Sequence, residues 1–129
     1  MFSERSSKVL VVDDEPGITE IVDAFLTTAG YDVMVENTSE GAIKRVSAWK
    51  PDVILLDIMM PVMDGYDVCA ALKKNQATAD IPVVFLTGKD ASDDQGRSFK
   101  SGGNLYVKKP FSCERLLDIV KIVLLSVNK

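Results

Sequence analysis

The stretch DVILLD at residues 52–57 places four consecutive apolar residues between two aspartates. A short run that is apolar without alternation is typical of a strand covered on both faces, as in the middle of a parallel sheet. The run leads into MPVMDG at 60–65, whose Pro and Gly predict a loop, and then into a helix over about 66–75. This order predicts a central strand with Asp57 at its carboxyl end.

The succession of a strand and a helix is repeated toward the N-terminus. KVLVVD at 8–13 predicts a buried strand, and apolar residues then recur at helical spacing over 16–30, between a proline and a glycine. YDVMVE at 31–36 alternates and predicts a strand nearer an edge of the sheet. Ser39 is placed to cap a helix that runs over 39–49.

Toward the C-terminus, PVVFLT at 82–87 predicts a fourth strand, and LYVK at 105–108 predicts a short fifth one. Residues 91–101 predict a weak helix, because Gly96 lowers helix propensity there. A final, strongly apolar helix is expected over 112–127, capped by its first serine. Five strands alternating with five helices predict a doubly wound α/β fold with helices on both faces of the sheet.

The composition fits one domain over residues 1–129, with an ordered core of about 7–127. The net charge is −4 and no Lys or Arg cluster is visible, so direct nucleic-acid binding is not expected. No apolar run is long enough to span a membrane, and the chain is interpreted as cytoplasmic. The absence of histidine excludes Ser-His or Cys-His catalysis within this chain.

Polar residues stand at the ends of four predicted strands: Asp13 and Asp14, Asp57, Thr87, and Lys108 with Lys109 and Pro110. Ligands of open parallel sheets bind at the carboxyl ends of the strands, so these side chains are expected to meet at one rim. Each has an ordinary structural role when taken alone, since an acid after a strand is usually a helix cap or a solvated turn. The combination of the four strand ends is what indicates a site.

Three carboxylates at one rim raise one another's pKa unless a cation compensates their charge. Mg²⁺ prefers oxygen ligands and binds through few carboxylates together with phosphate oxygens. One lysine leaves a net negative charge that Mg²⁺ would cancel. A carboxylate can also accept a phosphoryl group as an acyl phosphate, which makes Asp57 a candidate phosphoacceptor.

The sequence resembles bacterial response-regulator receiver domains, such as the chemotaxis regulators. The matching segments are VLVVDDEP at 9–16, DVILLDIMMPVMDGYDV at 52–68, PVVFLTG at 82–88 and YVKKPF at 106–111. They extend over nearly the whole chain. The resemblance implies a flavodoxin-like sheet with strand order 2-1-3-4-5, which the strand pattern alone leaves open.

The resemblance also implies roles for single residues. Asp57 is implied as the phosphoacceptor, and Asp13 and Asp14 as the organisers of Mg²⁺, with Asp14 favoured as the direct ligand. The backbone carbonyl of Met59 is implied as a further metal ligand. Thr87 is expected to bond a phosphoryl oxygen.

Further positions follow from the same motifs. Gly88 leaves room for the phosphoryl group, and Lys109 rather than Lys108 matches the family lysine because it directly precedes Pro110. The Lys109–Pro110 bond is expected to be cis, which aims the lysine inward. Tyr106 matches the aromatic switch position.

The implied mechanism is transfer of a phosphoryl group from a histidine kinase or phosphotransfer protein to Asp57. Thr87 then moves toward the phosphate, Tyr106 packs inward, and the face of the fifth strand and its neighbouring helices changes for an unidentified output protein. The phosphoryl group biases an existing two-state equilibrium. The chain is thus expected to be a signalling switch, catalysing only its own phosphorylation and dephosphorylation.

Three other interpretations compete with this one. A haloacid-dehalogenase-type phosphatase needs an acid two residues after the nucleophile, where this chain has Met59. A flavodoxin-like cofactor binder needs a phosphate-binding loop after the first strand, where the acids at 13–15 repel phosphate. A degenerate receiver, acting only as a constitutive interaction module, is not expected to retain the complete set of acids, threonine and lysine.

Three features depart from the family pattern or extend it. Glycines at 96, 102 and 103 lead us to expect that 90–104 is partly disordered before phosphorylation. Met59 and Lys89 match positions that flank the hydrolytic water, and an apolar Met59 predicts a long-lived phosphoaspartate. In the last helix, the predicted core stripe is Leu116, Val120, Val123 and Val127. The remaining apolar residues predict either a wider buried face or a surface for a partner protein or a dimer.

Overall fold

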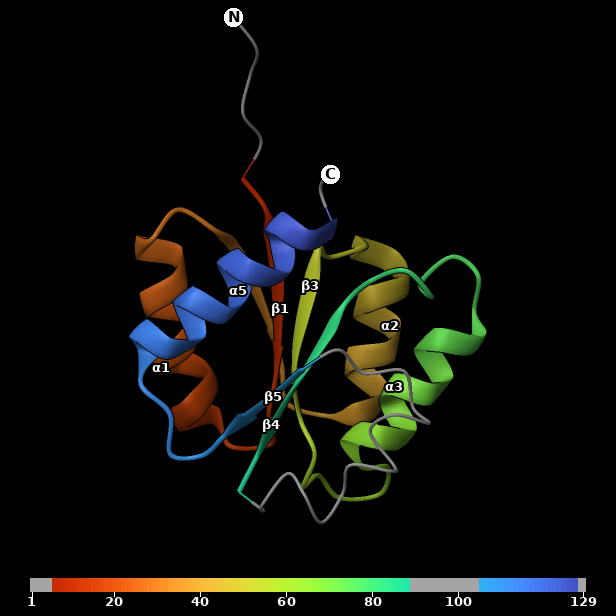
Figure 1. Cartoon of the computed structure of the whole chain (residues 1–129). Coiled ribbons are helices and arrows are strands. Elements are labelled where there is room, and N and C mark those ends of the chain that lie inside the picture. The colour runs from red at the N-terminus through yellow and green to blue at the C-terminus, as the bar shows by residue number, and fades with distance from the viewer. Residues whose placement is uncertain (1–5, 89–104, 128–129) are drawn as a thin grey trace, which may run out of the picture.

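The computed structural model describes residues 6–88 and 105–127. Its centre is a parallel sheet with the order β2-β1-β3-β4-β5, as expected. Figure 1 shows the sheet edge-on between two layers of helices. The strands are β1 (Lys8–Val12), β2 (Asp32–Glu36), β3 (Val53–Asp57), β4 (Val83–Thr87) and β5 (Leu105–Lys108).

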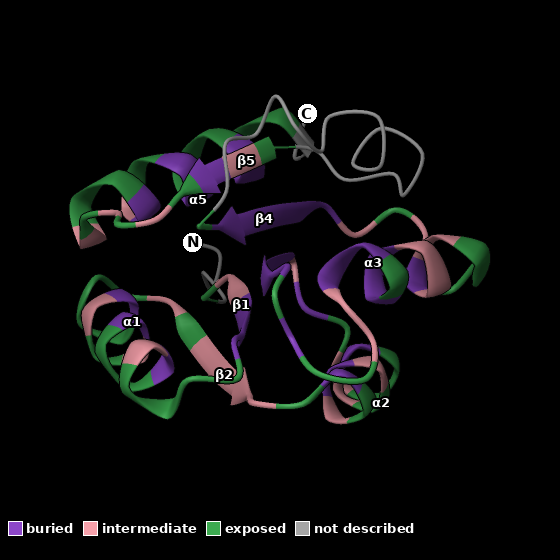
Figure 2. Cartoon of the chain, turned by 90° about the horizontal axis from the view of Figure 1, so that it is seen from below, coloured by how far each residue is buried: buried purple, intermediate pink, exposed green. Residues whose placement is uncertain are grey.

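Four helices are described, and they cover both faces of the sheet. They are α1 (Pro16–Thr28), α2 (Ser39–Trp49), α3 (Gly65–Lys74) and α5 (Cys113–Val127). Helices α1 and α5 lie on one face, and α2 and α3 lie on the other (Figures 1 and 2). The predicted helix over 91–101 and the disorder expected for 90–104 fall outside the described residues. None of the described helices is long and apolar enough to cross a membrane.

The central strands are buried on both faces, which explains their unbroken apolar runs. All five residues of β3 and of β4 are buried, whereas β2 at the edge is only partly covered (Figure 2). Successive residues of β3 enter different cores. Leu55 packs in the cluster with α1 and α5, and Leu56 packs in the cluster with α2 and α3. Because successive side chains of a strand point to opposite faces, β3 contributes to the hydrophobic core on both faces of the sheet.

Helix caps confirm one sequence prediction and correct another. Ser112 caps α5, because its Oγ accepts a hydrogen bond from the Arg115 N–H at 3.0 Å. The expected cap of α2 by Ser39 is wrong. Thr38 is the cap, with its Oγ1 accepting from the Gly41 N–H, and the Ser39 hydroxyl instead donates to the Met63 carbonyl in the β3–α3 loop.

The N-terminus of α3 packs directly on the backbone at the end of β3. The Gly65 N–H donates to the Ile58 carbonyl at 2.9 Å. A Cβ at Gly65 would lie 2.5 Å from the Asp57 carbonyl oxygen and 2.8 Å from Ile58 Cα. Only glycine permits this approach, and it holds the first turn of α3 against the residue that ends β3.

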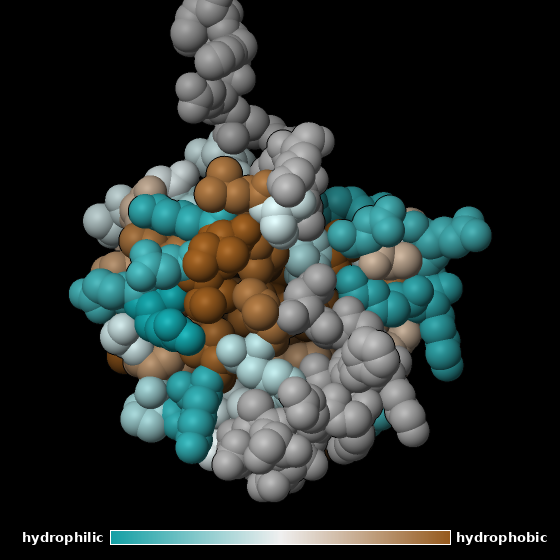
Figure 3. All heavy atoms as spheres, in the orientation of Figure 1, coloured by the Kyte–Doolittle hydropathy of each residue, from teal (hydrophilic) through white to brown (hydrophobic). Residues whose placement is uncertain are grey.

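The last helix buries a wider face than its predicted stripe. Leu116, Val120 and Val123 are buried as expected, and Ile119 and Leu124 are buried with them. Ile122 and Leu125 remain 57% and 74% exposed. Figure 3 shows apolar side chains gathered over α5 on the face that Figure 1 presents.

Candidate functional site

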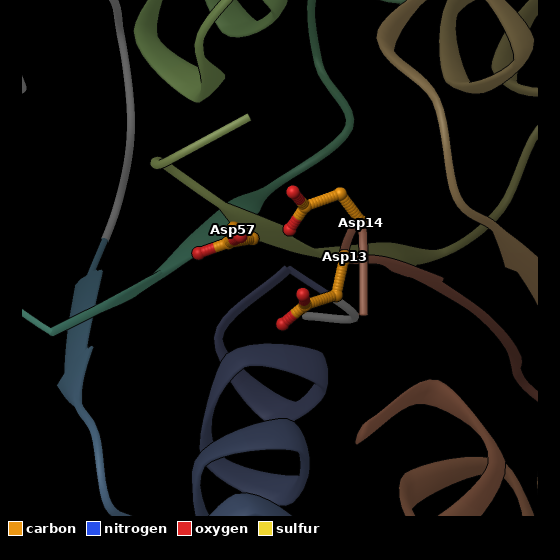
Figure 4. A group of neighbouring side chains, drawn as sticks. All are labelled: Asp13, Asp14 and Asp57. Atoms are coloured by element: carbon orange, nitrogen blue, oxygen red, sulfur yellow. The ribbon is translucent and has the colours of Figure 1, made fainter. Parts of the chain in front are cut away.

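Three carboxylates meet at the carboxyl ends of two neighbouring strands, β1 and β3. Asp13 and Asp14 follow β1 directly, and Asp57 is the last residue of β3, which pairs with β1. One carboxylate oxygen from each lies within 4.8 Å of the others. Figure 4 shows the three side chains next to one another. The sheet topology therefore brings together acids that are 43 and 44 positions apart in the sequence (57 − 14 and 57 − 13).

Lys109 joins two of these acids from the end of β5. Its Nζ lies 2.9 Å from Asp13 Oδ2 and 3.2 Å from Asp57 Oδ1, and 3.9 Å from Glu15 Oε1. The backbone N–H of Lys109 donates to the backbone carbonyl of Thr87 at 2.6 Å. The peptide bond between Lys109 and Pro110 is cis, as expected. Lys108 is exposed, so Lys109 is the lysine at this site.

The electrostatics of the site leave Asp57 short of positive charge. Burial, and after it the negative charge of Asp13, raise the pKa of Asp57, while the charge and hydrogen bond of Lys109 lower it; the net result is a pKa of about 6. Burial also lowers the pKa of Lys109, but its bonds to Asp13 and Asp57 outweigh this, and its pKa lies above the usual value. The single ammonium group of Lys109 therefore does not fully compensate the negative charge of the carboxylates.

Asp13 and Asp14 differ in how far their oxygens are engaged. Asp13 is fully buried; its Oδ1 accepts from the Glu15 N–H at 3.0 Å and its Oδ2 accepts from Lys109. Asp14 is exposed. Asp14 therefore has the more accessible carboxylate, in line with the preference given to it as a metal ligand.

The donor set fits a hard divalent cation. All three side chains offer carboxylate oxygens, the ligands that Mg²⁺ prefers, and their mutual spacing lets them approach a single ion. A cation next to Asp57 would favour its ionised form and so lower its raised pKa. No sulfur or imidazole ligand is present in the group, which disfavours a zinc site.

The other predicted residues differ in how far they are buried. Thr87 ends β4, next to β3, and is 1% exposed. An added Cβ at Gly88 would meet none of the described atoms within 4 Å. The Met59 side chain is 55% exposed, and Tyr106 on β5 is half-buried. Lys89 lies outside the described residues.

Sequence reasoning missed two residues that support the site. Asn37 Nδ2 donates to the Asp13 carbonyl at 2.7 Å and to Thr19 Oγ1 at 3.2 Å, which ties β1 to the end of β2. Its position just after a predicted strand was the available signal. Gly65 packs on the Asp57 backbone, whereas the sequence pattern predicts it only as a loop residue.

Residues 9–121 match the family model of the response regulator receiver domain. The chain therefore belongs to this family, whose general function is phosphorylation-dependent signalling in two-component systems. It is similar to the DNA-binding dual master transcriptional regulator RpaA of Synechocystis sp., with 39% identity over 119 residues. That match covers 91% of this chain and 48% of the relative, so the chain spans about half the length of such curated relatives.

Solved receiver structures agree with the fold. The chemotaxis protein CheY4 of Vibrio cholerae superposes with a TM-score of 0.88 at 29% identity, covering 92% of this chain and 99% of that one. The receiver domain of sensor histidine kinase PA1611 from Pseudomonas aeruginosa, solved with a magnesium ion coordinated in its active site cleft, has a TM-score of 0.84 at 26% identity. That match covers 93% of this chain and 98% of that one. Since relatives include a DNA-binding regulator, the expectation of no direct nucleic-acid binding has no support from them.

Proposed function

We propose that this receiver accepts a phosphoryl group on Asp57 from a histidine kinase or phosphotransfer protein and thereby controls an output protein. The observation that carries the proposal is the position of Lys109, whose ammonium lies between Asp13 and Asp57 while Asp14 completes the acidic cluster. This arrangement offers a nucleophilic carboxylate, a metal-binding group and a fixed positive charge at one rim.

Mg²⁺ is the proposed cofactor. The carboxylates of Asp14 and Asp57 and the backbone carbonyl of Met59 would hold it, and Asp13 would organise the site through its bond to Lys109. The bound metal would supply positive charge opposite the oxygens of the transferring group. The magnesium ion in the related PA1611 receiver supports this assignment.

Phosphoryl transfer would proceed by attack of an Asp57 carboxylate oxygen on phosphorus. A phosphorus–oxygen bond forms, the phosphorus–nitrogen bond of the donor's phosphohistidine breaks, and the electron pair leaves with the imidazole nitrogen. With a pKa of about 6, Asp57 is mostly ionised at neutral pH and can act as the nucleophile. Lys109 would neutralise charge on the new phosphoryl oxygens, and Thr87 would bond one of them.

The response to phosphorylation would pass to the face built from β5 and α5. Thr87 is proposed to move toward the phosphoryl group while Tyr106 packs inward, which changes the surface that an output protein recognises. A homodimer through α5 is part of the proposal, because Ile122 and Leu125 present apolar surface there. The cytoplasm is the proposed compartment, where kinase and output protein would meet it.

The phosphoaspartate is proposed to be long-lived. Met59 stands where the family orients the hydrolytic water, and its exposed thioether is too weak an acceptor to hold a water in place. Met59→Asn should shorten the lifetime by about threefold or more, the effect of one restored hydrogen bond. Loss of phosphate from purified protein, followed by intact-mass spectrometry, measures this. Equal lifetimes would remove Met59 as the cause.

Treatment with acetyl phosphate and Mg²⁺, followed by intact-mass spectrometry, tests the central proposal. The wild type should gain one phosphoryl group, and Asp57→Asn should gain none. Asp32→Asn is the matched control, because Asp32 is an exposed acid at the opposite end of the sheet and should leave the adduct unchanged. An adduct that persists in Asp57→Asn would contradict the proposal.

A further inference from the structure

Three aromatic rings form a row from α3 to β5, and the middle ring belongs to β4. Phe85 on β4 pairs in register with Tyr106 on β5. The Phe85 ring lies 4.9 Å from the Tyr66 ring, edge to face, and 5.6 Å from the Tyr106 ring. Tyr66, in the first turn of α3, is only 3% exposed. The ring of Phe85 therefore pairs with two tyrosines that belong to different elements.

The two tyrosine hydroxyls close this arrangement. Tyr66 Oη and Tyr106 Oη form a hydrogen bond between residues 40 positions apart, and either oxygen can be the donor. Tyr106 is half-buried and packs against the core cluster that contains Phe85 and Tyr66. An inward Tyr106 ring thus has an aromatic neighbour on its own sheet and a hydroxyl partner on the helix opposite.

The helix that carries Tyr66 is also fixed to the backbone of Asp57. Gly65, its immediate neighbour, donates to the Ile58 carbonyl and approaches the Asp57 carbonyl too closely to admit a Cβ. A shift of the Asp57 backbone would therefore move the first turn of α3, and with it the Tyr66 ring. This connection does not pass through Thr87 or β4.

We propose that Tyr66 is a positioning residue that holds Tyr106 inward through the hydroxyl pair and couples that position to the backbone of Asp57. The holding role is independent of phosphorylation, whereas the coupling role rests on the proposed function. A chain with phenylalanine or an aliphatic residue at 66 would keep the site and lose this contact. Tyr66 therefore sets how far Tyr106 is turned inward before any phosphoryl group arrives.

Fluorine NMR on protein labelled with 3-fluorotyrosine tests the holding role. The chain has three tyrosines, and single Tyr→Phe variants assign each resonance. Tyr66→Phe keeps the ring and removes the hydroxyl. In this variant, the chemical shift of the Tyr106 resonance should move toward the value of a solvent-exposed fluorotyrosine. Its relaxation by a soluble paramagnetic agent should rise by about twofold to tenfold, the range that one uncharged hydrogen bond supports. Tyr31→Phe is the matched control, because Tyr31 packs in the other core cluster.

An unchanged Tyr106 resonance in Tyr66→Phe would overturn the proposal, as would an equal change in Tyr31→Phe. The coupling role is read after treatment with acetyl phosphate and Mg²⁺, with intact-mass spectrometry of the same samples. Wild type and Tyr66→Phe should form the same adduct, but the change that it causes in the Tyr106 resonance should differ in size between the two proteins, because the hydroxyl pair is missing in the variant. An equal response would overturn the coupling. Failure of both proteins to form an adduct would refute the proposed function and still leave the unmodified spectra to decide the holding role.

Discussion

At the scale of single residues, Asp57 is a buried carboxylate whose charge is unfavourable in the metal-free protein. Its pKa is about 6 in the fold against 3.8 for an unperturbed aspartate. A raised pKa favours the folded state at low pH, and this contribution is lost as the pH rises through 6. In EDTA, the contribution of Asp57 to the free energy of unfolding should therefore fall by roughly 2–3 kcal/mol between about pH 4 and pH 7, since one pKa unit corresponds to about 1.4 kcal/mol.

Urea denaturation of wild type and Asp57→Asn across this pH range measures that contribution. The variant should lack the fall and be more stable than wild type at neutral pH. Mg²⁺ should narrow the difference, because it binds only the folded wild type well. Parallel pH profiles for the two proteins would show that the Asp57 charge is not unfavourable.

Val62 is a second residue that lowers the stability of the fold, here through its backbone conformation. Its φ is 71°, in the left-handed region that β-branched residues rarely occupy, and its side chain is fully exposed. Asparagine tolerates this conformation, so Val62→Asn should raise the free energy of unfolding by about 1 kcal/mol. Val62→Ala is the control: it retains a Cβ, so its free energy of unfolding should rise much less. A stability that is unchanged in Val62→Asn would mean that the loop relaxes at no cost.

At the scale of elements, the contact between α3 and β3 should be sensitive to one methyl group. Gly65→Ala would place Cβ 2.5 Å from the Asp57 carbonyl oxygen, so the helix or the strand end must move. We expect a loss of about 1–3 kcal/mol in stability and slower phosphorylation by acetyl phosphate. Gly17→Ala in α1 is the control, because its Cβ would meet nothing within 4 Å and should be neutral or stabilising. Equal effects at the two glycines would contradict this contact.

Elements themselves were well predicted where hydrophobic periodicity was strong. The apolar runs of β1, β3 and β4 identified buried strands, and their bounds differ from the predictions by one residue or less at each end. The cap of α2 was predicted wrongly, because Thr38 and Ser39 are both good cap residues. Only the tertiary structure shows that the Ser39 hydroxyl donates to the Met63 carbonyl and that Thr38 is the cap. The width of the buried face of α5 also needed the structure, since it depends on how the helix packs on the sheet.

At the scale of the whole molecule, the exposed apolar residues of α5 predict self-association after phosphorylation. Leu125→Glu should weaken a dimer by about tenfold or more, since it removes an apolar side chain worth about 1.5–3 kcal/mol on burial. Sedimentation velocity over a range of concentrations, with and without acetyl phosphate and Mg²⁺, measures this. Ile21→Glu on α1 is the control, as Ile21 is similarly exposed on another helix. A wild type that stays monomeric when phosphorylated would rule out the dimer.

The sequence by itself determined the alternation of strands and helices and the residue types at the strand ends, because both follow from periods of a few residues along the chain. The tertiary structure decided that Lys109 lies between Asp13 and Asp57, which are 96 and 52 positions away. It also decided that burial raises the Asp57 pKa, that Gly65 packs on the Asp57 backbone, and that Tyr66 meets Tyr106. The reason is physical: local backbone preference sets secondary structure, whereas desolvation and side-chain contact depend on which distant segments the fold packs together.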